Sequence, residues 1–174
     1  MKTLNPNAES NLACKSETIL LDGRWLYSDV VDRWSEQQQD WIASLQKERV
    51  IELYRLNLLG VSHRKIQKEK KIRVSDIIQL TFQVPYQRIN YPQQQCWAYS
   101  CCLQVVGLGR VRFVICFKDE SLRGSCIALL TNRLDWAPSR IVRKWLEHYP
   151  FPSVSSSKEI SRKKFYDICS VAQG

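Results

Sequence analysis

A carboxylate directly after a short apolar run is the residue of this sequence that is best placed for chemistry. The run Ile19–Leu21 is followed by Asp22 and then by Gly23. An acid at the point where a buried strand opens into a loop is held rigidly, because the strand fixes its backbone. Mg²⁺ requires hard oxygen ligands in fixed geometry, so Asp22 is a candidate magnesium ligand. A solvated turn aspartate after a buried strand is the ordinary alternative.

Basic side chains could bind a polyanion. The chain has 26 Lys and Arg residues against 17 Asp and Glu, which gives a formal net charge of +9. Nucleic acid is therefore the first partner to consider and an acidic membrane surface the second. Six basic residues fall within ten positions: Arg64, Lys65, Lys68, Lys70, Lys71 and Arg73. This basic stretch is either a solvated helix face or a surface that contacts DNA backbone without reading its sequence.

Several other kinds of site are not expected. The seven cysteines form no C-x-x-C pair, and His63 and His148 lie far from any cysteine pair, so zinc is not expected. A cysteine nucleophile would lack a histidine base in its neighbourhood. No apolar run is long enough to span a bilayer, and the first residues lack the apolar centre of a signal peptide. We therefore expect a cytoplasmic protein with reduced thiols and no membrane partner.

The elements that must position Asp22 alternate between strand and helix. Ile19–Leu21 reads as a strand, and Ser28 could cap a helix that runs to about Gln39. The segment 41–45 is a second short apolar strand. This order predicts an α/β fold.

The middle of the chain changes to the two-residue period of β-structure. Leu80, Phe82 and Val84 alternate with polar neighbours. Residues 97–105 form a longer alternating run, and the turn Gly107-Leu-Gly109 leads into another, which predicts a β-hairpin. Residues 127–130 add one further apolar strand. We therefore expect an antiparallel β-rich block over about residues 80–125.

A helix is expected near the end of the chain. Asp135 would provide an acidic cap and Pro138 would lie in the first turn. One face then carries apolar residues, and Pro150 and Pro152 end the helix. The sequence divides into a polar lead-in (1–17), a main unit (18–152) and a Ser-rich, basic tail (153–174).

These segments, in this order, resemble the DDE-type transposases of bacterial insertion sequences. The first is Asp22 with Gly-Arg-Trp-Leu-Tyr after it, and the second is the strand 41–45 followed by Lys47 and Arg49. The third is Ala128-Leu-Leu-Thr-Asn-Arg-Leu-Asp-Trp136, which leads into a helix. The resembling subgroup carries a β-strand insertion between the second and third segments. The likeness covers about residues 15–152.

The resemblance implies a partial ribonuclease H-like catalytic domain, interrupted by the β-rich block. In that family three carboxylates hold two Mg²⁺ ions that promote cleavage and strand transfer at DNA phosphodiesters. Asp22 matches the second Asp of the triad, and is thus the implied catalytic and metal-binding residue. Lys47, Arg49, Arg133 and His148 are the implied DNA contacts.

Two departures from the family pattern predict an inactive chain. Only 21 residues precede Asp22, and they contain no Asp and no strand-like run before Ile19. In the helical signature Trp145 and His148 take the places of Tyr and Arg, and Pro152 takes the place of the final Glu. One carboxylate cannot hold two divalent ions about 4 Å apart, so Mg²⁺ is not expected to bind productively. Whether Glu147 or Glu159 replaces the missing Glu stays open.

Two functions follow. The first is a truncated insertion-sequence transposase that binds DNA at the element ends, alone, as a dimer, or paired with a full-length transposase. The second is a basic, non-catalytic nucleic-acid-binding module. A truncated domain would also leave an exposed sheet edge or apolar face.

Overall fold

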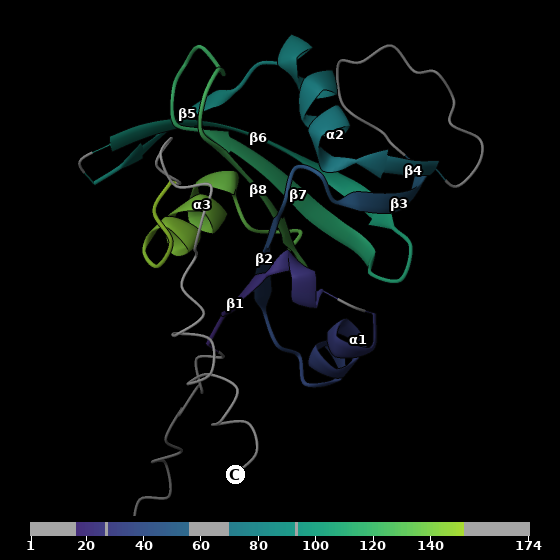
Figure 1. The fold of residues 1–174 in the computed structure, drawn as a ribbon. Coiled ribbons are helices and arrows are strands. Elements are labelled where there is room, and N and C mark those ends of the chain that lie inside the picture. Colours follow the sequence, from purple (N-terminus) through teal and green to yellow (C-terminus); the bar gives the residue numbers. More distant parts are fainter. Residues whose placement is uncertain (1–16, 27, 56–69, 93, 152–174) are drawn as a thin grey trace, which may run out of the picture.

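Apolar alternation along the chain produces one large mixed sheet with three α-helices. The computed structural model describes residues 17–26, 28–55, 70–92 and 94–151 (Figure 1). The helices are α1 (Ser28–Glu36), α2 (Val74–Leu80) and α3 (Pro138–Leu146), with 3₁₀ turns η1 (Gly23–Trp25) and η2 (Thr81–Gln83). The strands are β1 (Ile19–Asp22), β2 (Trp41–Leu45), β3 (Val50–Arg55), β4 (Lys70–Arg73), β5 (Gln87–Tyr91), β6 (Gln94–Val105), β7 (Gly109–Phe117) and β8 (Cys126–Thr131). The predicted α/β class is confirmed.

The sheet combines one parallel pair with an antiparallel remainder. Its strand order is β1-β2-β8-β7-β6-β3-β4, and β5 pairs with the first half of β6. β1 and β2 are parallel and are connected through α1, as a parallel pair requires a crossover. The strands of the predicted β-rich block continue this same sheet, because β7 pairs with β8 and β6 pairs with β3.

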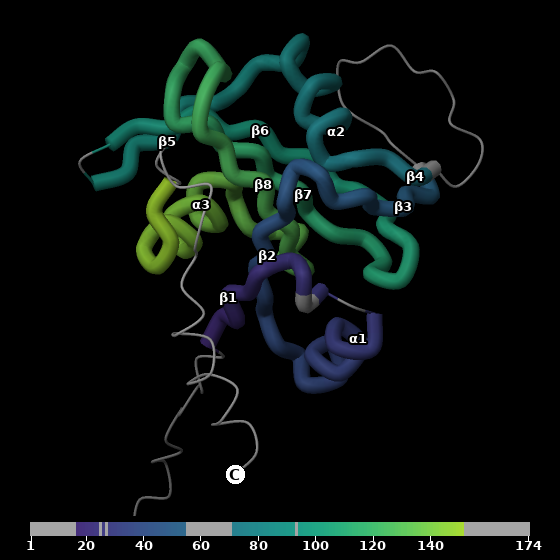
Figure 2. Tube along the Cα trace, in the orientation of Figure 1, coloured from purple at the N-terminus to yellow at the C-terminus, as the bar shows by residue number. Residues whose placement is uncertain are grey.

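A short connection makes the sheet curl. Only residues 46–49 join β2 to β3, although β8, β7 and β6 lie between these two strands in the sheet. In a flat sheet the two strands would be about 19 Å apart, which is at or beyond the reach of so short a segment. The sheet therefore bends until the beginning of β3 approaches the end of β2, as the tube trace shows (Figure 2).

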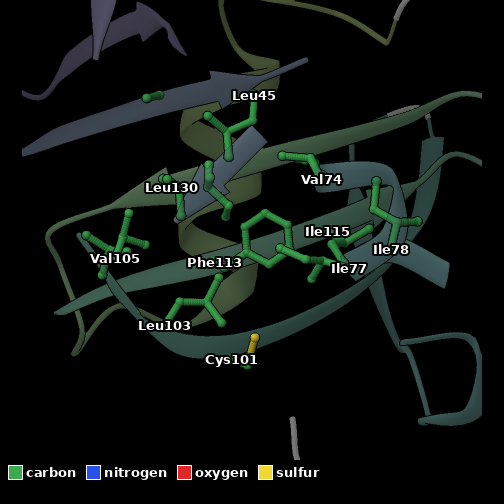
Figure 3. Close-up of a cluster of buried hydrophobic side chains, with 14 of the residues drawn as sticks. Leu45, Val74, Ile77, Ile78, Cys101, Leu103, Val105, Phe113, Ile115 and Leu130 are labelled. Carbon is green, nitrogen blue, oxygen red and sulfur yellow. The ribbon is translucent and has the colours of Figure 1, made fainter. Parts of the chain in front are cut away.

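The concave face of the curled sheet holds the main core. Phe113 lies at 0% exposure among buried aliphatic side chains, with α2 packed over them (Figure 3). Other members of this cluster are Leu45, Ile77, Ile78, Leu103, Ile115 and Leu130. Because these side chains come from four strands and one helix, their burial is the main force that holds the curl.

The opposite, convex face is covered in part by α3. Ile141, Val142 and Trp145 pack there against apolar residues of β2, β6, β7 and β8. Tyr149, just beyond the helix, stacks on Trp145 with ring centroids 4.6 Å apart. The expected helix and its proline in the first turn are confirmed. The acidic cap is wrong: Ala137 is the N-cap, and the Asp135 carboxylate pairs with Arg133 instead.

Residues 80–84 do not form the predicted strand. Leu80 ends α2, and the next three residues form η2. The helix prevails because Val74, Ile77 and Ile78 share one buried helical face. The hydroxyl of Thr81 then donates to the Ile78 carbonyl at 2.6 Å and pairs with the Tyr86 hydroxyl at 2.7 Å.

Three other expectations differ in detail. α1 begins at Ser28 as predicted but ends at Glu36, before Gln39. In the basic stretch, residues 70–73 form a strand and not a helix face, while 64–69 lie outside the described residues. Strands β3 and β5 were not predicted, since mixed polar residues hide their alternation.

Some predictions fall outside the described residues. These concern nearly all of the lead-in 1–17, the tail 153–174, Pro152 and Glu159. No helix within the described ranges has the length and apolar character needed to cross a membrane.

The core assignment predicts a clear contrast between two phenylalanines. Phe113→Ala should lower the free energy of unfolding by about 3–5 kcal/mol, because it opens a cavity in the concave core. Phe82→Ala is the matched control, since Phe82 is 48% exposed and should cost less than about 1 kcal/mol. Urea unfolding followed by tryptophan fluorescence measures both. Equal losses for the two variants would contradict this packing.

Candidate functional site at the carboxyl end of β1

Asp22 is the last residue of β1, as the sequence predicts. It lies opposite Ser44 in the parallel ladder with β2, and its side chain is 19% exposed. Side chains of a strand alternate between faces, so Asp22 shares the convex face with Leu20, which packs in the α3 cluster. The carboxylate is thus fixed at the end of an edge strand, on the side of the sheet that α3 covers.

The Asp22 carboxylate is fully engaged with Arg24. One oxygen accepts the Arg24 backbone N–H at 2.9 Å and caps η1. The other accepts Nε at 3.1 Å and Nη2 at 2.9 Å. The hydrogen bond to Asp22, followed by the attraction of its charge, raises the pKa of Arg24. A cation at Asp22 would have to compete with this guanidinium.

Gly23 allows β1 and β2 to meet at this end of the sheet. A Cβ at this position would overlap the carbonyl oxygen of Ser44 and press on Leu45. The glycine in the sequence after Asp22 is therefore required by close packing.

Arg49 stabilises the turn that follows Asp22. Its half-buried guanidinium donates to the carbonyl of Gly23 and, at 3.1 Å, to the carbonyl of Leu26. The structure therefore brings Arg49 to the predicted loop. Two of its donors are already used by the backbone, which gives Arg49 a positioning role that the sequence did not indicate.

Lys47 lies in the same 46–49 connection but is exposed. Its carbonyl accepts the N–H of Ser75 at 2.9 Å, which ties the connection to the start of α2. Its ammonium lies near Cys126 at the beginning of β8. Burial raises the pKa of the Cys126 thiol, and the positive charge of Lys47 offsets part of that rise.

Arg133 is not brought together with Asp22. β8 runs antiparallel to β2, so Arg133 follows it at the amino end of β1 and β2, whereas Asp22 lies at the carboxyl end. Its guanidinium binds Asp135 at 2.8 and 3.0 Å and Asp40 at 3.3 Å. The hydrogen bonds from Arg133 to Asp135 hold the pKa of that carboxyl below its ordinary value.

A cluster of cations around Trp136 was missed at the sequence level. Arg133, Arg140 and Lys144 lie 5.3, 4.1 and 5.5 Å from the centroid of the Trp136 ring. Trp136 itself is buried, so its ring packs in the interior and also forms cation–π contacts with these side chains. No local sequence pattern indicates the cluster, because Arg133 and Trp136 precede α3 and meet Arg140 and Lys144 only in the packed structure.

His148 and Glu147 lie just beyond α3, and both are exposed. The His148 N–H donates to the Trp145 carbonyl at 3.1 Å, which continues the last helical turn. In the described part of the chain, neither side chain forms a hydrogen bond or an ion pair with Asp22 or Arg49.

A small groove adjoins the turn after Asp22. It has a volume of about 180 Å³ and lies between the start of α1, the start of β3 and the β6–β7 hairpin. Its polar lining residues are Arg49, Glu52 and Ser28. The sequence could not indicate it, because the curl of the sheet brings these segments together.

The described residues do not fit the two magnesium ions that the resemblance implies. They contain no group of three or more His, Cys, Asp or Glu side chains that could hold a metal ion. Asp22 contributes one carboxylate, and Arg24 occupies it. No metal-dependent step is therefore derived for this chain.

The role of Arg49 leads to a stability prediction. Arg49→Met keeps much of the aliphatic stem but leaves the Gly23 and Leu26 carbonyls without their donor, so unfolding free energy should fall by about 1–3 kcal/mol. The exposed Lys118, changed to Met, is the control and should behave as the parent. Thermal and urea melts measure both variants. An Arg49→Met variant as stable as the control would show that the hydrogen bonds from Arg49 to the Gly23 and Leu26 carbonyls do not contribute to stability.

Comparison with known proteins found no counterpart for this chain: no family model, no curated protein and no solved structure matches it. The chemistry available at the carboxyl end of β1 is therefore judged from its own residues. They are one paired carboxylate, a glycine at a close strand contact and an arginine that binds the backbone of the turn.

Proposed function

We propose that this chain is part of the ribonuclease H-like catalytic domain of a DDE-type transposase from a bacterial insertion sequence. In this proposal it binds DNA but does not cut it. The support comes from the resemblance of three sequence segments and from the position that each takes in the fold.

One observation carries the proposal. β1, α1 and β2 form a parallel strand-helix-strand unit with Asp22 at the carboxyl end, on the face that α3 covers. The carboxyl ends of parallel strands are common places for functional side chains in open α/β sheets. In the proposed domain Asp22 is the second Asp of the triad, and α3 belongs to the helix that would carry the final Glu.

The same site explains why cleavage is not expected. Two divalent ions about 4 Å apart need several carboxylates to bridge and hold them. Asp22 is a single carboxylate with a guanidinium already bound to it. The first Asp of the pattern is missing from the sequence, and Pro152 occupies the place of the Glu.

The alternative function is a basic, non-catalytic nucleic-acid-binding module. It is favoured by a specific observation: Asp22 and Arg49 both stabilise the local structure. Asp22 caps η1, and Arg49 donates hydrogen bonds to the carbonyls of Gly23 and Leu26. These structural roles explain both residues without assuming that they once belonged to a metal-binding site.

A plasmid assay tests the absence of cleavage. The purified chain, incubated with supercoiled plasmid and Mg²⁺ or Mn²⁺, should retard the DNA and leave it uncut, and Asp22→Asn should behave in the same way. The reason is the incomplete carboxylate set. Mg²⁺-dependent nicking that disappears in Asp22→Asn would overturn the proposal of an inactive fragment.

The DNA around the reading frame tests the family. We expect the upstream DNA to encode a strand that ends in Asp, and another downstream frame to encode Trp-Pro-Ile-Glu followed by Lys. Inverted repeats should flank the whole. If neither coding segment is found, the binding module is the better description.

A salt titration tests one implied DNA contact. Affinity for duplex DNA falls with salt, and the slope of log affinity against log salt is negative. Lys47→Gln should make this slope less steep by about 0.9, because one phosphate contact is lost. Lys118→Gln removes the same charge from an exposed site on the chain after β7 and serves as the control. Identical slopes for the two variants would remove Lys47 from the DNA interface.

A further inference from the structure

A second surface lies on the convex side of the sheet, away from α3. It is formed by β3, β4, the end of β6 and the start of β7, and we name it the outer β3–β4 face. Its side chains are Glu52, Tyr54, Lys71, Arg73, Gln104 and Arg110.

Strand register places these side chains on one face. Glu52 lies opposite Lys71, while the neighbouring pair of Ile51 and Ile72 is buried on the concave side. Directly opposed residues share a face of the sheet, and the next pair along lies on the other face. Gln104 and Arg110 likewise form an outward pair beside buried Leu103 and Val111. These buried neighbours all belong to the core on the concave side, so the pairs between them face the convex side.

Tyr54 stands out on this surface. It is 43% exposed, although Leu53 beside it is only 1% exposed. The register of β3 against β6 shifts between Leu53 and Arg55, so Tyr54 is the extra residue of a bulge. Bulges often redirect a side chain for function. Here an exposed aromatic ring lies on a mostly polar face, on which Val50, opposite Arg73, is also exposed.

The cations of this face outnumber its one acid, Glu52, which lies opposite Lys71. Lys71, Arg73 and Arg110 are exposed, and in the described part of the chain none of them forms an ion pair. Arg24 and Arg133, by contrast, both bind carboxylates. Glu52, half-buried, is the single acid of the set. Three cations without an ion pair and an exposed ring on the same face of the sheet fit a polyanion with aromatic groups.

We propose that the outer β3–β4 face binds a single-stranded segment of nucleic acid. Tyr54 stacks on an unpaired base, and Lys71, Arg73 and Arg110 contact the phosphates. From β4 to β7 the face is about 14 Å wide, enough for a short run of nucleotides. A duplex keeps its bases stacked on each other, so only a single strand can offer a base to Tyr54.

This inference does not rest on the proposed transposase function. None of its residues belongs to the Asp22 turn, and none is an implied DNA contact of the family. Its failure and the failure of the transposase proposal can therefore be observed separately.

Fluorescence anisotropy with the full chain tests it. The probes are a labelled twelve-nucleotide oligothymidine and a labelled duplex of the same length. Tyr54→Ala should weaken oligothymidine binding about tenfold, in line with the loss of one stacked base. Tyr54→Phe keeps the ring and should bind as the parent does, whereas Tyr54→Leu keeps apolar bulk without an aromatic face and should resemble the alanine variant. Melting temperatures equal to that of the parent establish that each variant is folded.

The cations are tested as a set. We change Lys71, Arg73 and Arg110 together to Gln. The slope of log oligothymidine affinity against log salt should become less steep by about 2, since roughly 0.7 is lost for each phosphate contact. The matched control changes three exposed cations elsewhere to Gln: Arg88, Lys118 and Arg123. It should reduce the steepness of the slope by less than half as much.

Three results would overturn the proposal. The first is oligothymidine binding that survives Tyr54→Ala unchanged, and the second is an equal loss in the two triple variants. The third is a Tyr54→Ala variant that loses only self-association in sedimentation, with no change in oligothymidine affinity, which would assign the face to a second copy of the chain.

Discussion

The short connection between β2 and β3 is the constraint on which the rest of the structure depends. Four residues, 46–49, lead from one strand to another that stands four places away in the sheet. The sheet must curl to satisfy this, and the curl creates the concave core around Phe113. Because the connection itself lies where several elements meet, its backbone and side chains also hold them together. Arg49 binds the turn after β1, while the carbonyls of Lys47 and Arg49 accept the first N–H groups of α2.

Curling gives the two faces of the sheet different tasks. The concave face is filled with apolar side chains and leaves little room for a ligand. The convex face is divided: α3 covers the apolar half, and the other half keeps exposed cations and Tyr54. Among the described residues, the carboxyl end of β1 and the open half of the convex face are the two surfaces on which the proposals rest. The net charge of +9 favours a polyanionic partner, which is consistent with the nucleic-acid binding proposed above.

Local patterns predicted the elements well and their arrangement poorly. The continuous apolar runs at β1, β2 and β8 and the Gly107 turn have clear signals, and each was found where expected. The segment 80–84 was misread because three alternating apolar residues look like a strand, although the helical face that begins at Val74 extends into it. The placement of Arg133 at the opposite end of the sheet from Asp22 depends on the antiparallel pairing of β2 and β8, which no local pattern specifies.

The candidate site shows the same limit in sharper form. The sequence could indicate that Asp22 ends a strand, but not that Arg24 binds its carboxylate or that Arg49 binds the following carbonyls. These contacts arise from the curl, which brings residue 49 back to residue 23. Three further cations, around Trp136, become a cluster only when the chain after β8 and α3 pack on the sheet.

DNA binding depends on basic side chains and two-metal cleavage on carboxylates, and the two respond differently when some of these residues are missing. Attraction of cations to a phosphate backbone is a sum of separate contacts, so a chain that lacks part of a domain keeps the share that its own residues supply. Two-metal chemistry is a property of the complete carboxylate set, since a lone acid holds neither ion in place. Asp22 is such a lone acid, and Arg24 neutralises its charge locally. Among the described residues the basic surfaces, by contrast, remain open to solvent and need no missing partner to attract an anionic strand. If the chain is the transposase fragment proposed above, this difference explains why it would bind DNA without cutting it.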